Sequence, residues 1–343
     1  MPQTAKILVT GATGYIGGAV LGRFLARPDA TSLDFRAIVR SPEKAEKLKA
    51  FGITPIVGSH NDEQLMVKAA SEVDVVLAMA DSDDLSAAKA TLQGLKKRFE
   101  ETGNPPIFIN TSGTGTLTDK AAGMYTSDTI YDDSDPDQIE TLPATQIHRD
   151  VDLEIVGADR EGYIKSYIVL PATIYSIARG PLFEAGISNP HSIQVPGLIR
   201  ASIARKQAGM VGKGANFWPN VDVHELADLY SALWDSIMND PQTGHGREGY
   251  YFGASGEHRL YDVSQAIGEA LVPLGISNSP EPTSFTNEEL EKYFKGSTYS
   301  EHNSRCRATR SKSVGWNPKM TTKDFLKSIK PEVEAWVRKG AAV

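Results

Sequence analysis

The chain has 343 residues, a formal net charge of −7, 40% hydrophobic residues and 23% charged residues. This composition is ordinary for a folded globular protein, and its mild acidity argues against a dedicated nucleic-acid binder. The single cysteine, Cys306, excludes an intrachain disulfide. The sequence holds no run of about 18 apolar residues and no signal-peptide pattern, so we expect a cytoplasmic protein without membrane contact.

An apolar strand over residues 7–9 leads into a glycine-rich turn and then into an apolar-periodic helix. Gly11, Gly14 and Gly17 have the spacing that permits a tight turn, close approach of phosphate, and close packing of helix on strand. The helix N-terminus would present free N–H groups to the anion. An ordinary strand-to-helix turn is the alternative. We expect a dinucleotide pyrophosphate here, in contact also with Thr13, Tyr15 and Ile16.

The end of the second expected strand, residues 35–40, bears on the choice of cofactor. NAD sites usually place a carboxylate there, whereas this chain has Arg40 and Ser41, with Lys44 nearby. A guanidinium can pair with a 2′-phosphate through two parallel hydrogen bonds. We therefore expect NADP(H) in preference to NAD(H), although a solvated basic edge would have the same composition.

Further strands are expected over residues 53–57, 73–77 and 106–110, with helical stretches between them. Alternating strands and helices predict a doubly wound parallel sheet, a Rossmann-type α/β fold, with ligands at the carboxyl ends of the strands. The residues that follow these strands are expected to contact the cofactor: Ser59, His60, Ala78, Met79, Ala80 and Thr111.

The second half predicts a smaller, mostly helical substrate lobe. We expect a dinucleotide-binding domain over residues 1–175, to which parts of 215–255 return, and a substrate lobe over 176–343. Residues 181–186 are a candidate lid, and Phe217 and Trp218 lie in a glycine-flanked loop. Helices are expected over 193–206, 225–238, 261–271, 286–294 and 322–337, and a strand over 250–252. The sequence shows no internal repeat and no metal-binding constellation.

Several segments resemble the extended, or atypical, short-chain dehydrogenase/reductase superfamily. The turn over residues 10–17 is similar to its TGAxGxxG pattern, and Thr111 and Ser112 resemble its strand-end serine. Residues 221–227 resemble a helix start in its substrate lobe, and 311–318 its closing signature. The resemblance implies that the segment 170–175, with Pro171 and Ile174, faces the nicotinamide.

The family's usual catalytic pair is absent. Its reaction uses a tyrosine four residues before a lysine on one helix face, where the ammonium lowers the pKa of the phenol. None of the twelve tyrosines has a lysine four residues later. The expected helix falls over residues 145–154. If Arg149 is aligned with the family's lysine, Thr145 takes the position of the tyrosine; if His148 is aligned with it, Ala144 does. Neither arrangement supplies a phenol.

The candidates for catalysis are Ser112, His148, Arg149 and Tyr131. Ser112 should lie near a substrate carbonyl, with a capping serine as the alternative. His148 could act as an acid whose ring is held by the carboxylate of Asp152, one helical turn later. Alternatively, the two residues could form a surface salt bridge. Arg149 or His148 could instead bond the nicotinamide ribose. Tyr131 or Tyr125, in the polar stretch 114–137, could reach the nicotinamide or simply pack.

We therefore expect an NADP(H)-dependent oxidoreductase that reduces a carbonyl or a conjugated double bond of a small organic molecule with a non-standard proton donor. The alternatives are a silent NADP(H)-binding sensor similar to NmrA-like proteins, or a non-redox enzyme that retains the fold. A homodimer is possible, with the apolar stripe of residues 225–238 as a candidate contact.

Overall fold

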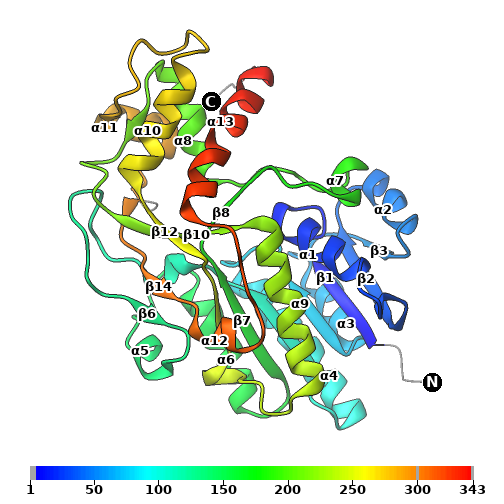
Figure 1. The fold of residues 1–343 in the computed structure, drawn as a ribbon. Coiled ribbons are helices and arrows are strands. Elements are labelled where there is room, and N and C mark those ends of the chain that lie inside the picture. Colours follow the sequence, from blue (N-terminus) through cyan, green and yellow to red (C-terminus); the bar gives the residue numbers. More distant parts are fainter. Residues whose placement is uncertain (1–4, 299–300, 341–343) are drawn as a thin grey trace.

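The computed structural model describes residues 5–298 and 301–340. Its centre is a sheet of seven parallel strands in the order β11-β7-β5-β4-β1-β2-β3 (Figure 1). This arrangement confirms the predicted doubly wound Rossmann-type sheet. The strands are β1 (Ala5–Thr10), β2 (Leu33–Val39), β3 (Thr54–Val57), β4 (Val75–Ala78), β5 (Ile107–Thr111), β7 (Lys165–Pro171) and β11 (Tyr250–Gly253). The strand order reverses between β1 and β4, where sheets of this kind bind ligands.

Helices cover both faces of this sheet because its strands are apolar and buried on both sides. On one face, α1 (Tyr15–Leu25) packs against α9 (Val223–Asn239), which returns to the sheet from the second half of the chain. On the other face, α4 (Leu85–Thr102) packs between α3 (Glu63–Ser71) and α6 (Arg149–Arg160). Helix α2 (Pro42–Lys49) begins with Ser41 as its N-cap and a proline in its first turn.

A second hydrophobic core lies in the C-terminal lobe, where four helices gather at one end of the molecule (Figure 1). They are α8 (Gln194–Arg205), α10 (Leu260–Leu271), α11 (Asn287–Phe294) and α13 (Thr322–Arg338). A three-stranded sheet, β12-β10-β8, connects the lobe to the Rossmann unit. Its strands are β8 (Thr173–Tyr175), β10 (Phe217–Asp222) and β12 (Gly256–Arg259).

The remaining elements are short. They are β6 (Tyr131–Asp132), β9 (Gly209–Met210), β13 (Thr283–Ser284), β14 (Cys306–Arg307), α5 (Pro136–Glu140), α7 (Pro181–Glu184), α12 (Thr309–Ser313), and 3-10 turns at Ala30–Ser32, Thr114–Leu117 and Gly246–Glu248. Among the helices of the described ranges, none is both long enough and apolar enough to cross a bilayer.

Three expectations about local structure need correction. The helix predicted from residue 145 begins only at Arg149, because His148 has the left-handed φ of 66°. The aromatic pair Phe217 and Trp218 starts strand β10 instead of lying in a loop. The candidate lid forms α7, which packs against α1 with Leu182 buried in the Rossmann core and does not line the cavity at the carboxyl ends of the strands.

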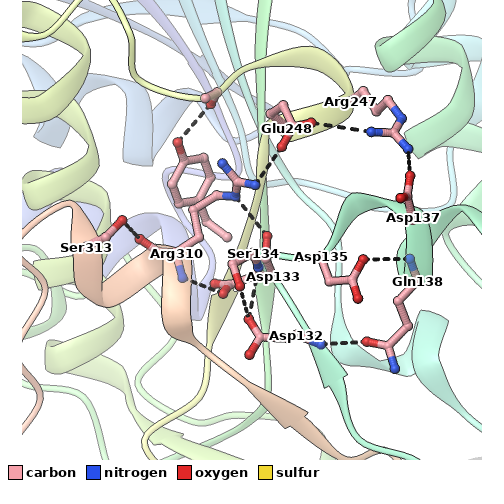
Figure 2. Close-up of polar contacts among 12 residues, drawn as sticks. Asp132, Asp133, Ser134, Asp135, Asp137, Gln138, Arg247, Glu248, Arg310 and Ser313 are labelled. Atoms are coloured by element: carbon pink, nitrogen blue, oxygen red, sulfur yellow. Dashed lines mark hydrogen bonds and ion pairs between the residues drawn. The ribbon is translucent and has the colours of Figure 1, made fainter.

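The long polar stretch after β5 is held by a buried carboxylate. Asp133 is fully buried and accepts hydrogen bonds from the backbone N–H of Phe252 (2.9 Å), Arg310 (2.6 Å) and Ser311 (3.0 Å), and from the Ser311 hydroxyl (2.8 Å). Burial raises the pKa of Asp133 despite these donors. Figure 2 shows Arg310 reaching from α12 to this segment and to Glu248. Three distant parts of the chain are therefore joined at one side chain.

We predict that Asp133→Ala lowers the free energy of unfolding by about 3–5 kcal/mol, because several buried donors lose their acceptor. The matched control is Asp135→Ala, which removes only the exposed N-cap of α5 and should cost about 1 kcal/mol. Urea unfolding of both variants measures the difference. Equal losses would contradict the central role of Asp133.

Candidate functional site

A cavity of about 440 Å³ opens at the carboxyl ends of β1, β4, β5 and β7, between the Rossmann unit and the C-terminal lobe. Its position agrees with the ligand site expected at the reversal of strand order. The Rossmann unit and β8 contribute Gly14, Tyr15, Ile16, Met79, Ala80, Ser112, Gly113, Thr114, Gly115, His148, Pro171, Ala172 and Ile174, and the later segments contribute Asn189, His191, Ser192, Ile193, Gln194 and Trp218.

The glycine turn forms one end of this cavity. A β-carbon at Gly17 would lie 2.1 Å from the Gly11 carbonyl oxygen, and one at Gly11 would lie 2.3 Å from the Met79 carbonyl oxygen. Gly14 is the N-cap of α1 and offers no side chain to its first N–H groups. These N–H groups have no partner within the helix, so they form a site for an anion at the mouth of the turn.

His148 is a polar side chain of the cavity that is held by a carboxylate. Its Nδ1 lies 2.7 Å from Asp83 Oδ1 and 3.0 Å from Ser82 Oγ, and its backbone N–H also donates to Asp83 Oδ1. An ionised carboxylate only accepts, so Nδ1 carries a hydrogen. A β-carbon at Gly113 would lie 3.0 Å from Nε2, which places the second ring nitrogen beside the Ser112–Gly113 backbone. The predicted partner was Asp152, and the structure corrects it to Asp83.

Asp152 lies instead beneath Ser112. Ser112 Oγ is 3.0 Å from Asp152 Oδ2, and both residues are buried. Burial raises the pKa of Asp152 from 3.8 to about 7, against the opposing effects of the Ser112 hydrogen bond and of Arg149. The carboxyl therefore changes protonation near neutral pH directly below the cavity wall.

The structure does not bring two of the predicted catalytic residues to this cavity. Arg149 is 2% exposed; its guanidinium donates to the Tyr250 hydroxyl (2.6 Å) and to the Ile139 carbonyl, away from the cavity. Tyr131 lines a separate, more polar cavity of about 500 Å³ beside the loop after β5. Thr111, a predicted cofactor contact, bonds the buried Tyr230 hydroxyl.

The residues expected to bind the adenosine half of the cofactor lie around the edge of the sheet, outside this cavity. Arg40 is exposed immediately after β2, and Ser41 and Lys44 are half-buried at the start of α2. Arg36, by contrast, is already paired with Asp34 and Glu72. Further round the sheet edge, Ser59 bonds Asn61, His60 lies 3.8 Å from Asp84, and Ala78 ends β4.

Sequence reasoning assigned the helix from Ile193 and the aromatic Trp218 to the substrate lobe, and both line the cavity, but it missed the preceding segment 189–192. Asn189 donates its backbone N–H to the Thr13 carbonyl oxygen, so this segment is fixed to the glycine turn. His191 and Gln194 follow within a few residues, but no short motif marks them. Within residues 5–298 and 301–340, no three His, Cys, Asp or Glu side chains cluster as a metal site would require.

The chain is similar in sequence to several known proteins. Residues 3–96 match the NmrA-like family. The chain is 29% identical over 298 residues to oxidase ucsJ of Acremonium sp, covering 80% of this chain and 81% of that protein. It is 38% identical over 130 residues to the phenylcoumaran benzylic ether reductase IRL1 of Ginkgo biloba, covering 35% of this chain and 41% of that one.

Solved structures match the fold along nearly the whole length. The UDP-glucose 4-epimerase of Thermotoga maritima, solved with UDP-glucose, has a TM-score of 0.64 and 16% identity, covering 98% of this chain and 100% of that one. The Thermus thermophilus UDP-glucose 4-epimerase in complex with NAD has a TM-score of 0.59 at 16% identity, with the same coverage. These structures show the fold, while the NmrA-like match and the oxidase and reductase relatives agree with the resemblance to atypical short-chain dehydrogenase/reductases.

Proposed function

We propose that this protein is an NADP(H)-dependent oxidoreductase that reduces a carbonyl or a conjugated double bond of a small organic molecule, with His148 as the proton donor. The observation that carries the proposal is that one cavity joins the glycine turn, Ser112 and a histidine held by a carboxylate. The oxidase and reductase relatives support the same class of reaction.

The residues present fit a nicotinamide dinucleotide. The turn has no room for side chains at Gly11 and Gly17, and the first N–H groups of α1 would bind the pyrophosphate. Pro171 and Ile174 line the cavity, where a nicotinamide ring could rest against them. When bound, this group would supply the hydride. Arg40 and Lys44 would hold a 2′-phosphate.

His148 can act as a proton donor because Asp83 holds its ring in one orientation. The bond from Nδ1 to Asp83 leaves Nε2 to transfer a proton to a substrate oxygen or carbon. The same carboxylate also accepts from the His148 backbone, which helps to stabilise the left-handed φ of this residue. The ring thereby replaces the missing phenol.

Ser112 orients the substrate according to the protonation of Asp152. When Asp152 is ionised, the Ser112 hydroxyl must donate to it and can only accept from a substrate. When Asp152 is neutral, its own O–H can donate to Ser112, which frees the serine hydrogen for a substrate carbonyl. The neutral carboxyl therefore favours reduction.

The alternative of a silent binder is supported by the NmrA-like match and by the missing Tyr-Lys pair. It would not require a hydrogen-bonded histidine in the cavity. The two functions differ in whether NADPH is consumed when a neutral aldehyde, ketone or enone is added.

We predict that Arg40→Ala weakens NADPH binding by about 10- to 100-fold, because a charged hydrogen-bond partner of the 2′-phosphate is lost. NADH binding should not change. Arg36→Ala is the control, since Arg36 is engaged by Asp34 and Glu72. Fluorescence titration with both cofactors measures this, and an equal loss for NADH and NADPH would refute the proposed 2′-phosphate contact.

We predict that His148→Phe lowers kcat for NADPH oxidation by about 100-fold or more, the usual contribution of general acid catalysis. Asp83→Asn should lower it less, because the ring keeps its place but loses its carboxylate. NADPH affinity should stay within about twofold in both variants, a change below about 0.5 kcal/mol. Unchanged kcat in His148→Phe would exclude this residue as the donor.

We predict a pH-dependent stability that Asp152 causes. Between its unfolded pKa of 3.8 and its folded pKa of about 7, the folded protein keeps a proton that the unfolded chain releases. The free energy of unfolding should therefore fall as pH rises through this range, by up to about 4 kcal/mol from this group. Asp152→Asn removes this contribution.

Urea unfolding at about pH 4 and about pH 8 measures the effect as the difference between wild type and Asp152→Asn. The variant should gain stability relative to wild type at the higher pH. An identical pH dependence in the two proteins would contradict a carboxyl that titrates near neutrality.

A further inference from the structure

The lobe side of the cavity carries a second histidine that is paired with a buried carboxylate. His191 Nδ1 lies 2.6 Å from Glu332 Oε1, and the two side chains are only 7% and 8% exposed. Glu332 comes from α13, and its Oε1 also accepts from Trp336 Nε1 at 3.0 Å. The Glu332 carboxylate therefore accepts hydrogen bonds from both rings. Because a carboxylate only accepts, the His191 ring must carry a hydrogen on Nδ1.

His191 is fixed in place independently of Glu332. Its backbone N–H donates to Asn189 Oδ1, while the Asn189 amide donates back to the His191 carbonyl oxygen. The Asn189 backbone and the Ser188 hydroxyl bond the carbonyl oxygens of Thr13 and Ala12 in the glycine turn. With Nδ1 engaged, Nε2 is the ring atom that can bind a ligand in the cavity that His191 lines.

The rest of the cavity is uncharged. In the described part of the chain, no Lys, Arg, Asp or Glu lines it. The apolar surface comes from Ile16, Met79, Ile174 and Trp218, and Ile193 at the edge is 84% exposed. Apart from the backbone anion site at the glycine turn, which the cofactor would occupy, a charged substrate group would find no cation here, whereas a neutral ring or alkyl chain would find apolar contacts.

We propose that His191, positioned by Glu332, recognises a hydroxyl group on an uncharged, largely apolar substrate. A hydroxyl both donates and accepts, so it can bond Nε2 whether or not that atom carries a hydrogen. The substrate then spans the cavity, with its reducible group near His148 and Ser112 and its hydroxyl at the lobe. This inference rests on the proposed function and adds a substrate class to it.

Binding of a matched pair of neutral enones in saturating NADP⁺ tests the proposal without turnover. We expect para-hydroxybenzalacetone to bind about tenfold more tightly than benzalacetone, the effect of one hydrogen bond to a polarised group. Isothermal titration calorimetry measures both affinities. Equal affinities, failure of both enones to bind, or tighter binding of UDP-glucose would each overturn the proposal.

The variants separate recognition from folding. His191→Phe combined with Glu332→Leu replaces the buried pair by apolar groups, a change that often preserves stability. This double variant should lose the hydroxyl preference and keep its NADP⁺ affinity. Glu332→Gln, which keeps the shape, should reduce the preference. His245→Phe is the control, because the His245–Asp159 pair lies outside the cavity. A preference that survives in the double variant would refute the assignment.

Turnover with NADPH distinguishes this proposal from the function on which it rests. A hydroxyl-dependent affinity without NADPH oxidation would leave the His191 contact in place and refute the oxidoreductase. Oxidation of NADPH by both enones with equal KM would support the oxidoreductase and refute the His191 contact. In the double variant we expect a rise in KM for the hydroxylated enone, with kcat nearly unchanged.

Discussion

The close contact between the first strand, its turn and α1 positions the rest of the site. Gly11 has a φ of 77°, and there is no space for a β-carbon at Gly11 against β4 or at Gly17 against Gly11. Side chains at these positions would push α1 away from the sheet. The anion site and the carbonyl oxygens that bind Ser188 and Asn189 both depend on this contact.

The two halves of the chain meet at that turn. The Rossmann unit supplies the glycine turn, Ser112 and His148, while the lobe supplies His191 and Trp218. Asp133 joins the loop after β5 to β11 and α12, so the C-terminal segment is fixed against the Rossmann unit. The cavity is therefore assembled from distant segments whose relative position depends on a few buried polar contacts.

Most of the sheet could be predicted from the sequence because apolar strands and glycine turns are local signals. The strand at Phe217 was missed because its residues include Trp218, Pro219 and Asn220, which do not alternate in polarity. The partner of His148 could not be predicted, since Asp83 is 65 residues away in the chain. Helical spacing suggested Asp152, but His148 lies before the helix and its ring turns to the β4–α4 loop.

Transfer of deuterium tests the central claim most directly. The wild-type protein would be incubated with a neutral enone and NADPH that carries deuterium on either face of the nicotinamide C4, and the product analysed by mass spectrometry. A reductase that uses this cavity should transfer deuterium from one face only to a substrate carbon. Tight NADPH binding with no labelled product from any neutral carbonyl or enone would contradict the account and indicate a silent cofactor-binding protein.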